Sequence, residues 1–182
     1  GISEQAMFDI ATGLALEGKK VVTYAMGPFI SLRAIEQIKC GPAMMDLPMT
    51  ILSVGIGLGY ADAGPTHYAT EDYACLRAIG GTSIFTASDN EISKKIAEKV
   101  LSNKSVNYVR LDRHPTKDIE LKQNKYDFED GYRVIGEYSE DKYAIISHGR
   151  ILHNCIKTIN QLSDKFYLVD LFRSKPISSK FI

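Results

Sequence analysis

Neither sign of charge is in excess in this chain, which has 22 lysines and arginines against 22 aspartates and glutamates. A basic surplus usually accompanies nucleic-acid binding, so nucleic acid is not predicted as a partner. No apolar run approaches the roughly 20 residues of a membrane span, and no signal peptide is recognisable, so no membrane is predicted either. The three cysteines, Cys40, Cys75 and Cys155, lie far apart, which favours reduced cytoplasmic thiols over a disulfide framework.

Two kinds of ligand-binding motif are also missing. The histidines and cysteines have no metal-ligand spacing, so no metal site is predicted within this chain. Gly55-Ile56-Gly57-Leu58-Gly59 follows a strand-like segment, but its glycine spacing differs from the Gly-x-Gly-x-x-Gly turn that binds dinucleotides. No helical pattern follows it immediately. A nucleotide-binding Rossmann domain is therefore disfavoured.

Strand-like and helix-like segments alternate through residues 1–114. Apolar residues at helical spacing predict helices at 5–17, from Gly27-Pro28 through Ile38, from Thr70 to Gly80, and through Ile92, Ile96 and Val100. Ser88 and Glu91 are a predicted capping box for the last of these. Short β-branched or buried runs predict strands at 20–25, 49–54, 82–86 and 106–111. This alternation predicts an α/β fold, with a parallel sheet and helices on both faces.

A second α/β unit follows a polar linker at 115–130. Within 131–182, the pattern predicts a strand at 143–147, a helix at 151–162 and a strand at 167–170. One such unit buries too little apolar surface to be stable alone, so this second unit is expected to be incomplete. Gly1 also stands directly against a helix, so we expect a fragment or part of something longer.

Glu4 lies at the start of the first predicted helix, where an acid can simply complement the helix dipole. Its neighbours suggest more. Gly1-Ile2-Ser3-Glu4-Gln5 and the ordered motifs after it resemble the pyrimidine-binding domain of the transketolase family over residues 1 to about 115. These motifs are Gly27-Pro28-Phe29, Gly64-Pro65-Thr66-His67, Leu76-Arg77-Ala78-Ile79 and Leu111-Asp112-Arg113. Residues 143–176 are similar to the start of the family's C-terminal domain.

The resemblance implies a thiamine diphosphate-binding fold in which Glu4 is catalytic and binds the cofactor. Its carboxylate would bond the aminopyrimidine nitrogen and favour the imino form of the cofactor's amino group, which removes the thiazolium proton. A desolvated carboxylate there is expected to have a raised pKa. Phe29 is the candidate for packing on the pyrimidine ring, with Tyr24 as a second candidate. Phe29 could equally be a core residue.

The resemblance also implies sugar-binding residues. His67 would contact the substrate and move protons, although alone it could be an exposed loop histidine. Arg113 would bind a sugar phosphate with its planar guanidinium, although it could equally be a surface arginine beside the linker. The other histidines, His114, His148 and His153, have no such support.

Two positions depart from the family pattern. Many transketolases have Asp-Gly-Pro-Thr-His, whereas here Ala63 precedes Gly64 and Asp62 stands one place earlier; Asp62 is thus the candidate for that substrate contact. Many also have a histidine after the 49–54 strand, where this chain has Gly55. Both family positions touch ketose hydroxyls, so the donor and acceptor sugars stay open.

The family binds the diphosphate and its Mg²⁺ or Ca²⁺ on a separate domain with a Gly-Asp-Gly motif, which this sequence lacks. The nearest string, Glu129-Asp130-Gly131, lies in the linker. The resemblance therefore implies a diphosphate-binding partner domain or subunit that holds the metal. The assembly would be a dimer or heterotetramer, as in a split transketolase.

The predicted function is transfer of a two-carbon ketol unit from a ketose, or ketose phosphate, to an aldose. Within thiamine enzymes, a deoxyxylulose-phosphate synthase or the beta subunit of a 2-oxo-acid dehydrogenase stays open, although the latter usually lacks Gly-Pro-Thr-His. A non-catalytic α/β interaction module is the alternative of another class, and the intact Glu4 argues against it.

Overall fold

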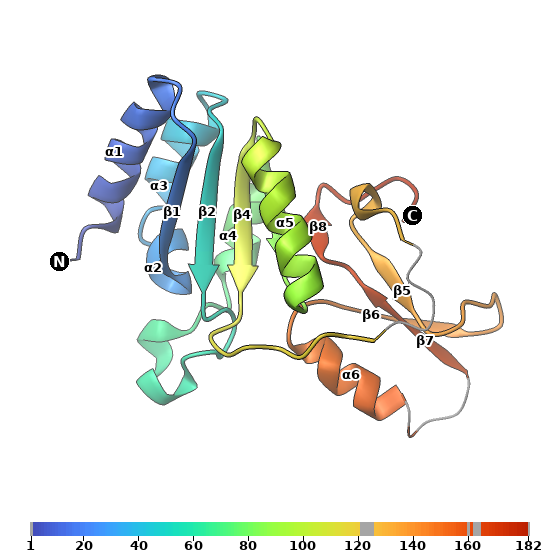
Figure 1. Ribbon diagram of the computed structural model, residues 1–182. Helices are drawn as coiled ribbons and strands as arrows, with labels where there is room; N and C mark the ends of the chain where they lie inside the picture. The colour runs from blue at the N-terminus through green and yellow to red at the C-terminus, as the bar shows by residue number, and fades with distance from the viewer. Residues whose placement is uncertain (1, 121–125, 160, 162–164, 182) are drawn as a thin grey trace.

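The main sheet has five strands, of which four are parallel. The computed structural model describes residues 2–120, 126–159, 161 and 165–181. The strand order is β1 (Val21–Met26), β2 (Met49–Val54), β4 (Val106–Leu111), β3 (Thr82–Thr86) and β8 (Arg173–Lys175) (Figure 1). Met26 pairs with Val54, and Val54 with Leu111, so β1, β2 and β4 end level at one edge. The segments that follow these strands therefore start side by side.

Helices cover both faces of this sheet, because successive strand residues point to opposite sides. Those on one face are α1 (Glu4–Leu16), α2 (Gly27–Ser31), α3 (Ile35–Ile38) and α4 (Asp72–Ala78). The helix α5 (Asn90–Ser102) covers the other face (Figure 1). On β3, Ile84 packs in the first hydrophobic cluster and its neighbour Phe85 packs under α5. The predicted α/β fold with helices on both faces is confirmed.

A smaller sheet follows the first. Its strands are ordered β5 (Arg133–Ile135), β7 (Phe166–Asp170) and β6 (Tyr143–Ser147), with α6 (Ile151–Ile159) between β6 and β7 in the chain. After β7 the chain re-enters the main sheet as β8, antiparallel to β3. Phe172, which lies between β7 and β8 in the chain, is fully buried in the α5 cluster. Its ring stacks on Phe128 with ring centroids 4.9 Å apart. The small unit therefore completes its core on the first unit.

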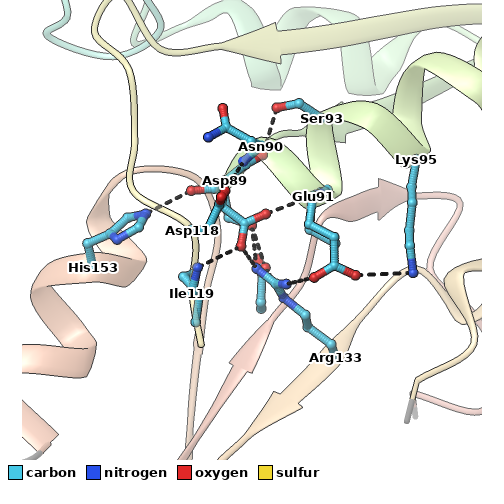
Figure 2. A network of polar contacts seen from close by, with 12 residues as sticks. Asp89, Asn90, Glu91, Ser93, Lys95, Asp118, Ile119, Arg133 and His153 are labelled. Atoms are coloured by element: carbon cyan, nitrogen blue, oxygen red, sulfur yellow. Dashed lines mark hydrogen bonds and ion pairs between the residues drawn. The ribbon is translucent and has the colours of Figure 1, made fainter. Parts of the chain in front are cut away.

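A buried ionic network also joins the two units (Figure 2). Arg133 of β5 is fully buried and donates to Asp89 at 2.6 Å and to Asp170 at 3.0 Å. The Ser88 hydroxyl donates to Asp170 at 2.5 Å, while the Ser88 carbonyl lies 2.8 Å from the ring nitrogen Nε2 of His153. Both units thus contribute charges to one water-excluded cluster.

The two buried carboxylates of this network, Asp89 and Asp170, differ in how fully their oxygens are hydrogen-bonded. Asp89 also accepts hydrogen bonds from the backbone N–H groups of Ile92 and Ile119, at 2.9 and 3.2 Å. One oxygen of Asp170 has no hydrogen-bond partner among the described residues. Burial accordingly raises the pKa of Asp170 to about 6, even though the Arg133 guanidinium opposes this shift.

The predicted capping box of α5 is wrong by one residue. The helix is capped by Asp89, whose side chain accepts from the Ile92 N–H. Ser88 is instead held by its hydrogen bond to Asp170, and Glu91 forms an ion pair with Lys95 at 3.3 Å. A buried partner from the distant second unit overrides the local capping preference of Ser88.

The predicted helix from Gly27 through Ile38 is broken. Residues 32–34 form a turn between α2 and α3, and a π-helical turn, η1 (Lys39–Ala43), follows α3. Gly41 has non-helical angles, with φ −84° and ψ −107°, and the next residue, Pro42, has no N–H to donate. The helix therefore cannot continue past η1.

The short strands β5 and β8 were not predicted. Each has only three residues and includes a charged side chain, such as Arg133 or Lys175, so neither shows an apolar alternation. Leu162, the predicted end of the last helix, lies outside the described residues, as does 121–125 of the predicted linker. Among the described residues, none of the helices combines the length and apolar character that a membrane crossing requires.

Candidate active site

The level edge of β1, β2 and β4 gathers three segments that carry predicted site residues. The helix α2, with Phe29, follows β1 directly. The loop after β2 contains two 3₁₀ turns, η2 (Ala61–Ala63) and η3 (Pro65–His67). Arg113 follows β4. Sequence segments far apart in the chain thus meet at one end of the sheet (Figure 1).

An unbroken path of contacts leads from Glu4 to His67. Arg33 donates to the Glu4 carboxylate at 2.7 Å, and its guanidinium lies 4.4 Å from the ring centre of Phe29. The Phe29 ring meets His67 edge to face, with centroids 5.1 Å apart. The residues predicted to contact cofactor and substrate are therefore neighbours in space.

The same path continues from His67 to the predicted sugar-binding pair. Tyr60 lies 6.4 Å from His67 between ring centroids, and the Arg113 guanidinium lies 4.5 Å from the Tyr60 ring centre. Arg113 donates to Asp62 at 2.5 Å, and this hydrogen bond lowers the pKa of the Asp62 carboxyl. The structure thus brings five of the six predicted site residues together, with Arg33 and Tyr60 as the connecting groups.

Tyr24 is the predicted site residue that does not join this path among the described residues. It is 61% exposed on β1 and pairs with Leu52, which faces the α5 cluster. The helix α2, with Phe29, packs against the opposite face of the sheet. The cofactor role of Tyr24 stays a prediction without a structural contact to support it.

Gly55 is required by the position of Tyr60. Its φ of +76° is a left-handed backbone conformation that residues other than glycine rarely adopt. A Cβ built there would lie 2.0 Å from the Tyr60 ring. The Tyr60 ring therefore fills the space into which a side chain at position 55 would project. This explains in steric terms why a histidine is absent from the end of β2.

In this structure the pKa of Glu4 is lowered, whereas a raised pKa is expected for this carboxyl when it is desolvated against a ring nitrogen. The hydrogen bond from Arg33 lowers the pKa of the Glu4 carboxyl and outweighs the opposing effect of its partial burial. Sequence reasoning missed Arg33, although a signal was present. Arg33 is the single charged residue in the stretch 21–35.

Replacing Arg33 with methionine is expected to raise the pKa of Glu4, because the charge-assisted hydrogen bond that lowers it is removed. Carboxyl carbon chemical shifts followed through a pH titration would measure this change. Lys39→Met, which removes an exposed charge from η1, is the matched control and should leave the Glu4 titration in place. An unchanged Glu4 pKa in Arg33→Met would contradict the assigned ion pair.

A buried polar cluster centred on Asp72 lies where the loop after β2 ends and α4 begins, and sequence reasoning missed it. Asp72 at the start of α4 is fully buried and accepts two hydrogen bonds from Arg110, at 2.9 and 3.0 Å. It also accepts from the Tyr108 hydroxyl at 2.7 Å, and burial raises the pKa of that tyrosine. The sequence pattern around Asp72 indicates only a helix start and carries no sign of a buried ion pair.

Comparison with known proteins agrees with this geometry. Residues 1–117 match the family model described as transketolase, pyrimidine binding domain. A protein of Actinobacillus succinogenes, named as one subunit of an apulose-4-phosphate transketolase, is 27% identical over 166 residues, covering 91% of this chain and 52% of the relative. Its namesake from Phocaeicola vulgatus is 28% identical over 189 residues, covering 100% and 59%.

Solved transketolases share the fold. A transketolase from Campylobacter jejuni superposes with a TM-score of 0.87 at 20% identity, over 95% of this chain and 28% of that one. A structure described as a split gene transketolase, inactive beta4 tetramer, superposes at 0.77 with 23% identity, over 98% and 58%. The chain thus spans between a quarter and about three fifths of these proteins. Because the family model covers well over half of its residues, the chain belongs to the transketolase family.

Proposed function

We propose that this chain supplies the pyrimidine-side half of a thiamine diphosphate site in an enzyme that transfers a two-carbon ketol unit from a ketose to an aldose. The contact path from Glu4 through Phe29 and His67 to Arg113 carries this proposal. These side chains are the types that a thiamine transferase needs, and they come from separate segments of a chain in the transketolase family.

The residues at the start of this path fit an aminopyrimidine ring. Glu4 offers a carboxylate that is 16% exposed, with Arg33 as its side-chain hydrogen-bond partner among the described residues. Phe29, half-buried, offers an aromatic ring next to it. A carboxylate for the ring nitrogen and an aromatic side chain for the ring face together match the polar and apolar parts of the pyrimidine.

When bound, thiamine diphosphate supplies a carbon nucleophile that accepts the two-carbon unit. Glu4 would hold a proton between its carboxylate and the ring nitrogen, and Arg33 would keep that carboxylate ionised until the ring arrives. His67, beside Phe29, would exchange protons with substrate hydroxyls. Arg113 and Asp62 would orient the far end of the sugar.

The diphosphate and its Mg²⁺ or Ca²⁺ would be held by a partner domain or by another polypeptide. The sequence has no Gly-Asp-Gly motif, relatives of comparable coverage are named as one subunit of a transketolase, and one solved relative is described as a split gene product. We expect the chain to form a dimer or heterotetramer with such a partner. Residues 131–182 would be the start of the C-terminal domain.

Calorimetric titration of thiamine diphosphate with Mg²⁺ tests this proposal. We expect heat of binding from the complex with the diphosphate-binding partner and none from this chain alone. Tight binding by the chain alone would contradict the half-site. No binding by the complex would favour a non-catalytic interaction module. Ketol transfer between a ketose and an aldose, compared with oxidation of a 2-oxo acid and with deoxyxylulose-phosphate synthesis, then identifies the reaction.

A further inference from the structure

A cavity of about 770 Å³ extends the candidate site toward the second unit. Among the described residues, its lining includes Asp62 and Arg113 of the first unit but neither Glu4 nor Phe29. From the second unit, the lining includes His148, Arg150 and two residues of the first turn of α6, Ile151 and Asn154. A ligand held by Asp62 and Arg113 in this cavity would therefore also lie against the second unit.

Two arginines face this cavity from opposite units, and an aspartate orients each of them. Arg113 donates through one nitrogen to Asp62 at 2.5 Å, and Arg150 donates through one nitrogen to Asp112 at 3.1 Å. A guanidinium has five N–H donors in a fixed fork, so each arginine retains donors for a ligand. The aspartates hold the guanidinium groups in place without using up those donors.

A third arginine in the lining has a different role. Arg110 donates both Nε and Nη2 to the fully buried Asp72, so its fork is already occupied. Its charge is balanced by that of Asp72. Burial is the main cause of the lowered pKa of His148, and the Arg110 charge lowers it further. Arg113 and Arg150 are therefore the arginines whose donors can reach a ligand.

His148 gives an independent sign that the cavity holds a polar ligand. It lines the cavity at the end of β6, and its ring stacks on Tyr73 with centroids 6.3 Å apart. Its Nδ1 is buried and has no hydrogen-bond partner among the described residues. Buried polar atoms in folded proteins are usually satisfied, so a ligand hydroxyl or phosphate oxygen is the natural partner for this nitrogen.

We propose that Arg150 is a specificity-determining residue which, together with Arg113, binds the phosphate end of the sugar substrate. The cavity is larger than a phosphate group, and its apolar parts, such as Ile56 and Leu58, leave room for the carbon chain behind it. The start of α6 adds the partial positive charge of a helix N-terminus beside Arg150. This role of Arg150 rests on the function proposed above. Because Arg150 belongs to the second unit, substrate binding would connect that unit to the catalytic path.

The test compares Arg150→Met with Lys157→Met, which removes an exposed charge from the same helix and lies outside the cavity lining. In the complex with the diphosphate-binding partner, we expect Arg150→Met to raise KM for a phosphorylated ketose about tenfold, with kcat nearly unchanged. The unphosphorylated ketose should be unaffected. Arg150→Lys should recover part of the affinity, because it keeps the charge but not the fork.

Equal losses for both donors would overturn the proposal and make the Arg150–Asp112 pair a structural contact. An unchanged KM for the phosphorylated donor would also overturn it. Thermal unfolding of each variant shows whether any loss reflects folding, and Arg150→Lys then decides. The Lys157→Met chain should match the unchanged protein in every assay.

Inorganic phosphate, titrated into this chain while arginine Nε–H chemical shifts are followed, needs no ketol transfer. We expect saturable shifts at Arg113 and Arg150, and binding about tenfold weaker in Arg150→Met but not in Lys157→Met. This result can hold even if the complex transfers no ketol unit, in which case the proposed function fails and the anion site stands. Absence of phosphate binding, or binding that ignores Arg150, would overturn the site itself.

Discussion

Replacing Glu4 with glutamine is expected to lower the kcat of ketol transfer by roughly 10²–10⁴-fold while the fold is retained. The amide has nearly the same size but cannot take up or share the proton of the pyrimidine nitrogen. Glu4 stands at the first residue of α1, is partly exposed and bonds only Arg33 among the described side chains, so the substitution leaves no buried charge behind.

Steady-state kinetics of the complex at saturating thiamine diphosphate would measure this loss, and circular dichroism would report on the fold. Glu36→Gln is the matched control, because Glu36 is also an acid in the first turn of a helix but is exposed. It should keep full activity. A Glu4→Gln enzyme with kcat close to that of the unchanged protein would reduce Glu4 to a residue that complements the helix dipole.

Replacing Arg133 with methionine is expected to lower the free energy of unfolding by about 3–5 kcal/mol. The guanidinium is fully buried and faces two buried carboxylates, Asp89 and Asp170. Without it, the two carboxylates are left in a low-dielectric interior with no counter-charge. The loss should be larger at pH 8 than at pH 5, because Asp170, whose pKa burial already raises to about 6, is protonated at the lower pH and carries no uncompensated charge there.

Urea denaturation of the chain at both pH values would measure these losses. Asp170→Asn in the Arg133→Met background should recover part of the stability, since one of the two buried charges is then absent. Arg77→Met, which removes an exposed arginine from α4, should change stability by less than about 1 kcal/mol. A loss of similar size in Arg133→Met would mean that the network contributes little to joining the units.

The sequence predicts the parts of this protein that local patterns encode. Four parallel strands and the helices α1, α4, α5 and α6 follow from apolar periodicity, and Glu4, His67 and Arg113 follow from short motifs. The links between those residues were not predictable, because Arg33 and Tyr60 meet their partners across separate segments. Ser88 likewise satisfies a local capping rule and is diverted by Asp170, 82 positions away.

The sheet as a whole was also beyond local reasoning. The strand β8 is too short and too charged to show an apolar alternation. It pairs with β3 next to Phe172, which is buried in the core under α5. The lowered pKa of Glu4 has the same origin, because it depends on Arg33, in the turn between α2 and α3, which no spacing rule connects to α1. Long-range burial and pairing decide what the motif alone leaves open.

The steric relation between Gly55 and Tyr60 also constrains how such a protein can change over generations. A histidine at position 55, as many transketolases have, cannot enter while the Tyr60 ring occupies that space, because the Cβ alone would lie 2.0 Å from it. Loss of the ring must come first or at the same time. The residues at positions 55 and 60 are thus sterically coupled, because a side chain at position 55 is accommodated only once position 60 has changed.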